Sequence, residues 1–117
     1  MVAIGVFKSS GALDVLTFAL KPITSLINMP SEVVPLVILR PISGSGATAV
    51  VQDILKSCGA DSFAGRVASV MQGSTETTFY TLAVYFGATG VKNIKRAIPC
   101  AVIGDITGII TALMIIR

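Results

Sequence analysis

The chain has 117 residues, of which 53% are hydrophobic and 13% charged, and its net charge is +3. Soluble domains carry roughly a quarter charged residues, so this composition excludes an ordinary soluble domain and favours a chain surrounded mainly by lipid. The length allows one domain over residues 1–117, with three or four membrane crossings of about 20 residues each.

Three function classes are disfavoured by the inventory of side chains. The nine Lys and Arg residues form no long run, so we expect no nucleic-acid partner. The chain has no His, and Cys58 and Cys100 stand far apart, so neither a Ser-His-Asp triad nor a common zinc site can form. We therefore predict a protein that is not an enzyme and has no metal and no cofactor.

The first forty residues predict short helical pieces. The apolar stretch 1–7 resembles the second half of a helix and is too short to cross a bilayer, so we expect the chain to be a fragment or to begin later than its relatives. A short helix is predicted over 11–20, with Ser9 or Ser10 as its N-cap and an end at Lys21 and Pro22. Residues 23–39 predict a short interfacial piece and then a half-crossing that ends at Arg40.

Two polar, glycine-rich breaks interrupt the apolar sequence at 40–46 and 72–78. Helices are predicted over 47–57, with Gly59 as C-cap, from Asp61 through Met71, and over 77–89. Backbone groups exposed to hydrocarbon cost several kcal/mol each, so such breaks persist at membrane depth only where protein, water or ligand satisfies them. We expect an all-α, polytopic membrane protein with broken or re-entrant helical hairpins.

Residues 97–116 predict one complete crossing, with Asp105 as its single charge. Its small residues recur every four positions, which is typical of close helix packing. The stripe consists of Gly104, Gly108 and Ala112. Basic residues at 92–96 place the preceding loop on the cytoplasmic side by the positive-inside rule.

Polar side chains at the two breaks predict a shared solute or ion site, because half-helix N-termini and hydroxyls can bind a polar ligand inside a membrane. The candidate residues are Arg40, Ser43, Ser45, Gln72, Ser74, Thr75, Glu76 and Thr77. Glu76 could bind the ligand or could stabilise a helix N-terminus. Arg40 could bind an anion, pair with Glu32 or Asp53, or anchor the chain at the interface. Asp105 should face protein or water and either pair with a cation or stay protonated.

Four motifs in order resemble the spore maturation protein B family. They are Phe7-Lys-Ser-Ser-Gly-Ala-Leu-Asp14, Arg40-Pro-Ile-Ser-Gly-Ser-Gly-Ala47, Asp61-Ser-Phe-Ala-Gly-Arg66 and Met71-Gln-Gly-Ser-Thr-Glu-Thr-Thr-Phe-Tyr80. The resemblance implies a multi-pass cell-membrane protein of endospore-forming bacteria with a nucleoside-recognition or Gate domain. It also implies a partner similar to spore maturation protein A and a role in dehydration of the spore core. The resemblance further implies N-terminal transmembrane segments before the position of Met1, which we expect this chain to lack.

The Gate domain is similar to parts of concentrative nucleoside and ferrous iron transporters, so Gln72, Thr75 and Glu76 match a polar hairpin tip. Nothing in these residues selects a nucleobase or a ribose. Two hypotheses follow: a transporter-like or gating subunit, or a structural partner that binds through the small-residue stripe and moves no solute. The lipid bilayer, a second copy of the chain and a small solute or ion are further candidate partners.

Overall fold

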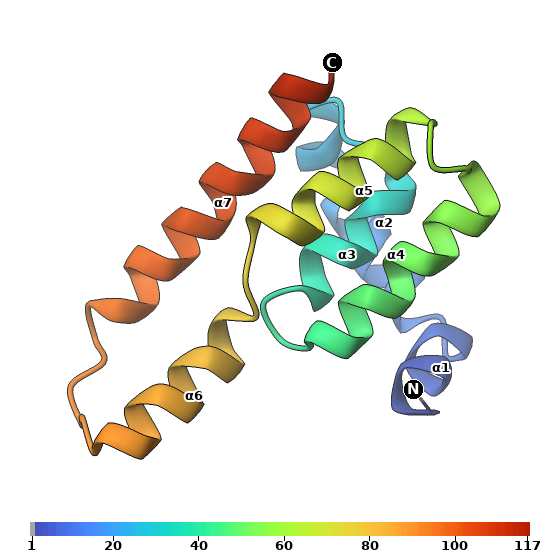
Figure 1. Cartoon of the computed structure of the whole chain (residues 1–117). Helices are drawn as coiled ribbons and strands as arrows, with labels where there is room; N and C mark the ends of the chain where they lie inside the picture. Colours follow the sequence, from blue (N-terminus) through green and yellow to red (C-terminus); the bar gives the residue numbers. More distant parts are fainter. Residues whose placement is uncertain (1) are drawn as a thin grey trace.

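The computed structural model describes residues 2–117, without the side chains at positions 3, 4, 7, 8 and 13, and Met1 lies outside the description. Over this range the chain forms seven α-helices and one short 3-10 helix, with no strand (Figure 1). The predicted all-α class is confirmed. Among the described residues, one helix is long and apolar enough to cross a membrane.

The N-terminal region consists of α1 (Val2–Ser9) and α2 (Ala12–Leu26). Neither predicted serine caps α2, because its N-cap is Gly11, whose φ of 73° suits a residue without a Cβ atom. The predicted end at Pro22 is also wrong, since Pro22 lies inside α2. The helix continues for another turn, in which Thr24 and Ser25 donate their hydroxyls to backbone carbonyls three residues earlier.

The half-crossing predicted before Arg40 is a short 3-10 helix, η1 (Ser31–Val33), followed directly by α3 (Val34–Leu39). Pro35 lies in the first turn of α3, where its missing N–H costs little. Arg40 is the C-cap of α3, which confirms the predicted end of this segment.

Helices α4 (Gly44–Cys58) and α5 (Phe63–Ser74) follow and pack against each other. Each begins after a serine whose hydroxyl accepts a backbone N–H three residues on: Ser43 from Gly46, and Ser62 from Gly65. This capping moves the start of α4 three residues before the predicted one. The predicted C-cap, Gly59, is confirmed and has a φ of 88°.

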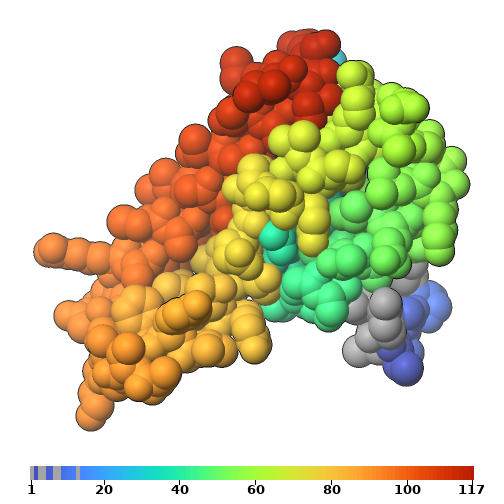
Figure 2. Space-filling view, viewed as in Figure 1, coloured from blue at the N-terminus to red at the C-terminus, as the bar shows by residue number. Residues whose placement is uncertain are grey.

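The C-terminal part is a helical hairpin of α6 (Thr78–Thr89) and α7 (Ala97–Ile116). The bounds of α7 are those predicted. Figure 1 shows α6 and the start of α7 standing away from the other helices, while the C-terminal half of α7 lies beside α5. In the space-filling view α6 and the start of α7, drawn in orange, project from the body that contains α4 and α5 (Figure 2).

The hydrophobic core lies between η1, α3, α4 and α5, and the C-terminal half of α7 closes it. Its largest fully buried side chains are Val33, Val34, Leu36, Val67 and Met71. Ala112 and Leu113 are the buried residues of α7. Only this end of α7 is buried in the core, so most of the α6–α7 hairpin is uncovered.

Candidate functional site

The two predicted breaks are real interruptions of the helices, but both are shorter than expected. The first runs from Arg40 to Ser43, between α3 and α4, and the second from Thr75 to Thr77, between α5 and α6. Ser45 therefore lies in the first turn of α4, and Gln72 and Ser74 lie in the last turn of α5.

Arg40 connects the first break to the second. Its Nε donates to Thr75 Oγ1 at 3.1 Å, and its Nη2 donates to the carbonyl oxygen of Gln72 at 2.8 Å and also to that of Thr75. The side chain is only 9% exposed, so these bonds form largely away from solvent. Hydrogen bonds from a charged donor are stronger than neutral ones, and this set attaches α3 to the end of α5.

The acceptors of Arg40 explain why a cation is stable there. The last carbonyls of a helix have no partner within the helix and carry partial negative charge. At the C-terminus of α5, Arg40 donates to the carbonyls of Gln72 and of the C-cap residue Thr75. The carbonyl of Met71 accepts from the backbone N–H of Thr75 at 3.2 Å and from the Thr75 hydroxyl at 2.6 Å. The guanidinium therefore adds to the backbone cap that Thr75 provides.

Two further contacts hold the breaks side by side. The backbone N–H of Phe79, in the first turn of α6, donates to the carbonyl of Pro41 at 3.0 Å. A Cβ atom on Gly44 would lie 3.1 Å from Thr77 Oγ1, so the two chains approach closely where Gly44 has only hydrogen. The two breaks are therefore in direct contact within the chain.

A groove of about 330 Å³, with four hydroxyl-bearing residues in its wall, opens where the breaks adjoin. It is lined by Ile42, Ser43, Gly44, Ser45, Thr77 and Tyr80. The hydroxyls of Ser43 and Ser45 are 3.4 Å apart, and both lie at the N-terminus of α4, where partial positive charge collects. Hydroxyls that donate and accept suit a small hydroxylated or amide-bearing ligand.

The remaining predicted residues do not line this groove. Arg40 and Thr75 form the connection between the breaks. Gln72 donates its Nε2 to Thr48 Oγ1 at 3.1 Å, and its buried Oε1 has no partner in the described part of the chain. Ser74 lies against Gly108 of α7, since a Cβ atom there would be 3.3 Å from the Ser74 carbonyl oxygen.

Glu76 is exposed, outside the apolar helix α7. Its Oε1 accepts from the backbone N–H of Thr77 at 2.9 Å and from the Thr77 hydroxyl at 3.4 Å. The carboxyl group of Glu76 therefore binds its own neighbour Thr77 beside the second break and does not line the groove.

Sequence reasoning included Thr78 among the hydroxyls of the second break, but it identified neither the partner of Thr78 nor the position of Tyr80. Thr78 donates its hydroxyl to Asp105 Oδ2, which connects the start of α6 to α7. Tyr80 lines the groove because it follows Thr77 by three residues and so lies on the same face of the helix. This spacing is visible in the sequence and could have indicated that Tyr80 belongs to the site. Asp105 thus accepts from a neutral hydroxyl, whereas a cation was one of the expected partners.

A second cavity, of about 240 Å³, lies between the breaks and α7. Most of its wall is apolar, with Arg40, Thr75 and Asp105 as polar members; the others are Val37, Pro41, Met71, Phe79, Val102, Ile106 and Ile109. Arg40, at the end of α3, and Asp105, on α7, therefore line the same cavity.

The small-residue stripe of α7 divides into two parts. Gly108 lies against the second break, and Ala112 is 2% exposed and belongs to the core. Gly104 has open space where a Cβ atom would be. Within this chain, two of the three stripe residues therefore pack against the chain itself.

Fold and site together define a helical membrane-type protein in which two helix breaks are joined beside one apolar helix, α7, that is long enough to cross a membrane. The model of the family described as "Gate: Nucleoside recognition" matches residues 1–92, so the chain belongs to the nucleoside-recognition (Gate) family. That family and the apolar helix α7 indicate a membrane location.

The chain is also 50% identical over 116 residues to spore maturation protein B of Bacillus subtilis (strain 168). The match covers 99% of this chain and 65% of that relative, so the chain spans slightly less than two thirds of the relative's length. Neither the family description nor the relative's name denotes an enzyme. No solved structure matches the chain.

Proposed function

We propose that the chain is a transporter-like or gating subunit of the cell membrane that takes part in spore maturation. In this proposal the two helix breaks form a polar site for a small solute or ion, the protein is multi-pass, and a membrane protein similar to spore maturation protein A completes the pathway. Movement through this pathway would contribute to dehydration of the spore core.

The observation that carries the proposal is the connection between Arg40 and the second break. A buried guanidinium bonded to Thr75 Oγ1 and to two carbonyls holds two interrupted helices together, with a hydroxyl-lined groove at the junction. In membranes, irregular backbone is tolerated where it is satisfied by protein or lines a polar cavity, and transporters place such breaks at their binding sites.

The bond between Thr78 and Asp105 supports a position of the breaks near the middle of the bilayer. Asp105 follows the first residue of α7 by eight positions, which corresponds to about 12 Å along the helix axis. Half of the hydrocarbon core is about 15 Å. If α7 spans the membrane, Thr78 and the adjoining groove therefore lie close to its mid-plane.

The groove favours an uncharged, hydroxyl-bearing solute over a metal ion. Its polar groups are the hydroxyls of Ser43, Ser45, Thr77 and Tyr80, and no carboxylate lines it. Nucleosides are the first class to test because the family is described by nucleoside recognition.

The test is uptake and binding in proteoliposomes that contain the chain alone or with the partner, using nucleosides and monovalent and divalent cations. The variant Ser45→Ala/Tyr80→Phe removes two groove hydroxyls and keeps the Ser43 cap. The control Ser57→Ala/Tyr85→Phe makes the same changes on α4 and α6 at exposed positions outside the groove. We expect the groove variant to lose about tenfold in solute binding, since neutral hydrogen bonds contribute about 0.5 to 1.5 kcal/mol each. Equal binding by both variants, or no binding and no flux under any condition, would contradict the proposal.

One observation favours the alternative of a structural partner without transport. Most of the apolar helix α7 is not buried within the chain, and Gly104 presents an open position for a neighbouring helix. This alternative expects Gly104→Leu to prevent co-purification with the partner while solute binding never occurs. The transport proposal expects Gly104→Leu to leave solute binding by the isolated chain unchanged.

A further inference from the structure

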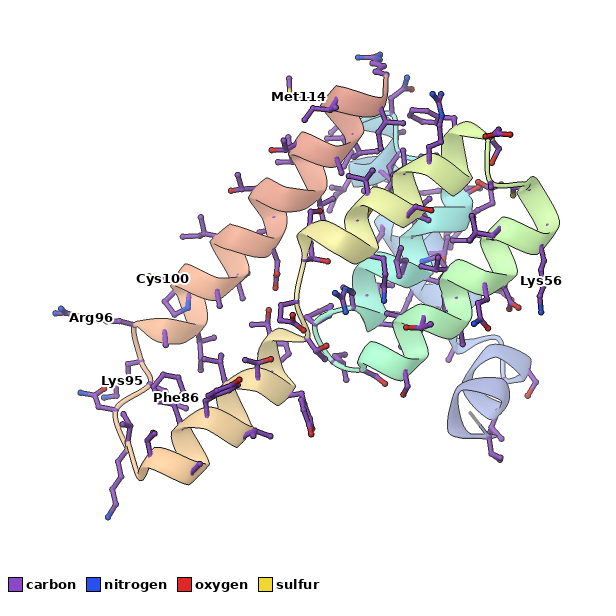
Figure 3. The ribbon with its side chains drawn as sticks, in the orientation of Figure 1. Lys56, Phe86, Lys95, Arg96, Cys100 and Met114 are labelled. Atoms are coloured by element: carbon purple, nitrogen blue, oxygen red, sulfur yellow. The ribbon has the colours of Figure 1, made fainter. Side chains whose placement is uncertain are left out.

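The loop between α6 and α7 carries three cations, Lys92, Lys95 and Arg96, which together we call the basic tip. All three are exposed and lie at the end of the hairpin that stands away from the core. In Figure 3 the labelled side chains of Lys95 and Arg96 point outward from this end. Lys56, on α4, lies on the opposite side of the molecule.

The charge of the basic tip is not balanced within the hairpin. No Asp or Glu lies between Glu76 and Asp105, so the whole of α6, the loop and the first two turns of α7 carry positive charge alone. Three cations within five residues, without an interspersed anion, make a strong local potential at an exposed end.

Helix stability does not explain two of these cations. Lys95 and Arg96 immediately precede α7, and Arg96 is its N-cap without a side-chain cap hydrogen bond. The N-terminus of a helix carries partial positive charge, so cations there are unfavourable. An external anion would remove this repulsion.

The surface on both sides of the basic tip includes exposed apolar and aromatic side chains. Tyr85 and Val91 are 68% and 46% exposed before the tip, and Ile98 and Ile103 are 36% and 63% exposed after it. An anionic partner therefore has to present negative charge directly beside an apolar layer. A phospholipid leaflet has this arrangement, whereas a nucleic acid or an acidic protein surface would leave the apolar sides of α6 and α7 in water.

We propose that the basic tip docks on the headgroups of anionic phospholipids while the exposed sides of α6 and α7 lie in the acyl chains below. The partner is the lipid surface and not a free anion, because the tip and the apolar sides are continuous. This inference concerns lipid selectivity and does not depend on whether the groove binds a solute.

The experiment uses the full chain in nanodiscs of phosphatidylcholine containing phosphatidylglycerol. Electron paramagnetic resonance measures how strongly spin-labelled phosphatidylglycerol, compared with spin-labelled phosphatidylcholine, is immobilised at the protein. The test variant is Lys92→Gln/Lys95→Gln/Arg96→Gln. The control, Lys21→Gln/Lys56→Gln/Arg66→Gln, removes the same charge at exposed positions elsewhere.

We expect the unaltered chain and the control to prefer phosphatidylglycerol, and the test variant to lose this preference, by up to about fivefold for each cation removed. The preference should weaken in high salt because the cations are exposed. Equal loss in both variants, or no preference in the unaltered chain, would overturn the proposal. Displacement of the labelled lipid by millimolar glycerol phosphate would also overturn it, since the tip would then bind soluble anions.

A second measurement leaves the basic tip intact. Cys100 is an exposed free thiol on α7, four residues after Arg96, and can carry a fluorophore in a Cys58→Ser variant. Bromine in the acyl chains of phosphatidylglycerol should quench this fluorophore more strongly than bromine in phosphatidylcholine at equal mole fraction. Identical quenching by the two lipids would contradict docking on anionic lipid.

Discussion

Arg40 donates through Nε to Thr75 Oγ1 at 3.1 Å, across 35 positions of sequence, and this bond joins the end of α3 to the end of α5. The same guanidinium bonds the carbonyls of Gln72 and Thr75, so one side chain caps α5 and holds the two breaks at one place. Because Arg40 both caps α5 and holds the two breaks together, we expect a substitution of Arg40 to change the stability of the protein and the geometry beside the groove.

Replacement of Arg40 should lower stability markedly. In Arg40→Ala the carbonyls of Gln72 and Thr75 lose a buried charged donor, and hydrogen bonds to charged groups contribute about 1.5 to 3 kcal/mol. We expect a fall of at least that size in the free energy of unfolding, measured in detergent micelles. Arg40→Lys should recover only part of it, because an ammonium cannot reproduce the planar fork of donors. Arg66→Ala, at an exposed position, should change stability by less than about 0.5 kcal/mol.

The two glycines of α7 should respond differently to the same substitution. Gly104 has open space, so Gly104→Ala should be neutral or stabilise the helix by up to about 1 kcal/mol. A Cβ atom on Gly108 would lie 3.3 Å from both the Ser74 carbonyl oxygen and Thr75 Cγ2, so Gly108→Ala should lose this gain and Gly108→Leu should cost about 1 to 3 kcal/mol. Thermal unfolding in micelles measures the difference, and equal effects at both positions would show that α7 does not pack on the second break.

The hydroxyl of Thr78 and the carboxylate of Asp105 should be energetically coupled. In a double-mutant cycle with Thr78→Val and Asp105→Ala, we expect a coupling free energy of about 1.5 to 3 kcal/mol, the range for a hydrogen bond to a charged group. Thr78→Ser should keep most of it, because the donor remains. Additive effects of the two substitutions would mean that α6 is positioned without this bond.

Pro22 should limit the stability of α2. Proline in a helix interior lacks the N–H that would bond four residues back and costs about 3 kcal/mol compared with alanine. We expect Pro22→Ala to raise helix content in circular dichroism and to raise the melting temperature. Pro35→Ala, in the first turn of α3, serves as the control and should not increase helix content. A loss of stability in Pro22→Ala would indicate that a bend at Pro22 is needed to seat α2 on α3.

Local chemistry in the sequence was sufficient to predict most helix ends. Gly59 ends α4 through a positive φ, and a predominantly apolar run of twenty residues with a single charge defines α7 from Ala97 to Ile116. Where prediction failed, a competing local effect was stronger. The Ser43 cap extended α4 backwards, and the hydroxyls of Thr24 and Ser25 accompany a helix that continues past Pro22.

The sequence by itself determined that the chain is apolar and helical and that it is interrupted twice by polar, glycine-containing segments, because composition and helix-breaking residues act over a few neighbouring positions. Which side chains meet was decided only by the tertiary structure. Arg40 reached the carbonyls at the end of α5 because the packing of α3, α4 and α5 brings the two breaks together. Thr77 and Tyr80 line the groove, whereas Gln72 contacts α4 and Ser74 contacts α7. The side of a helix on which a residue lies depends on where the helix starts and on what it packs against, and neither can be read from the neighbouring sequence.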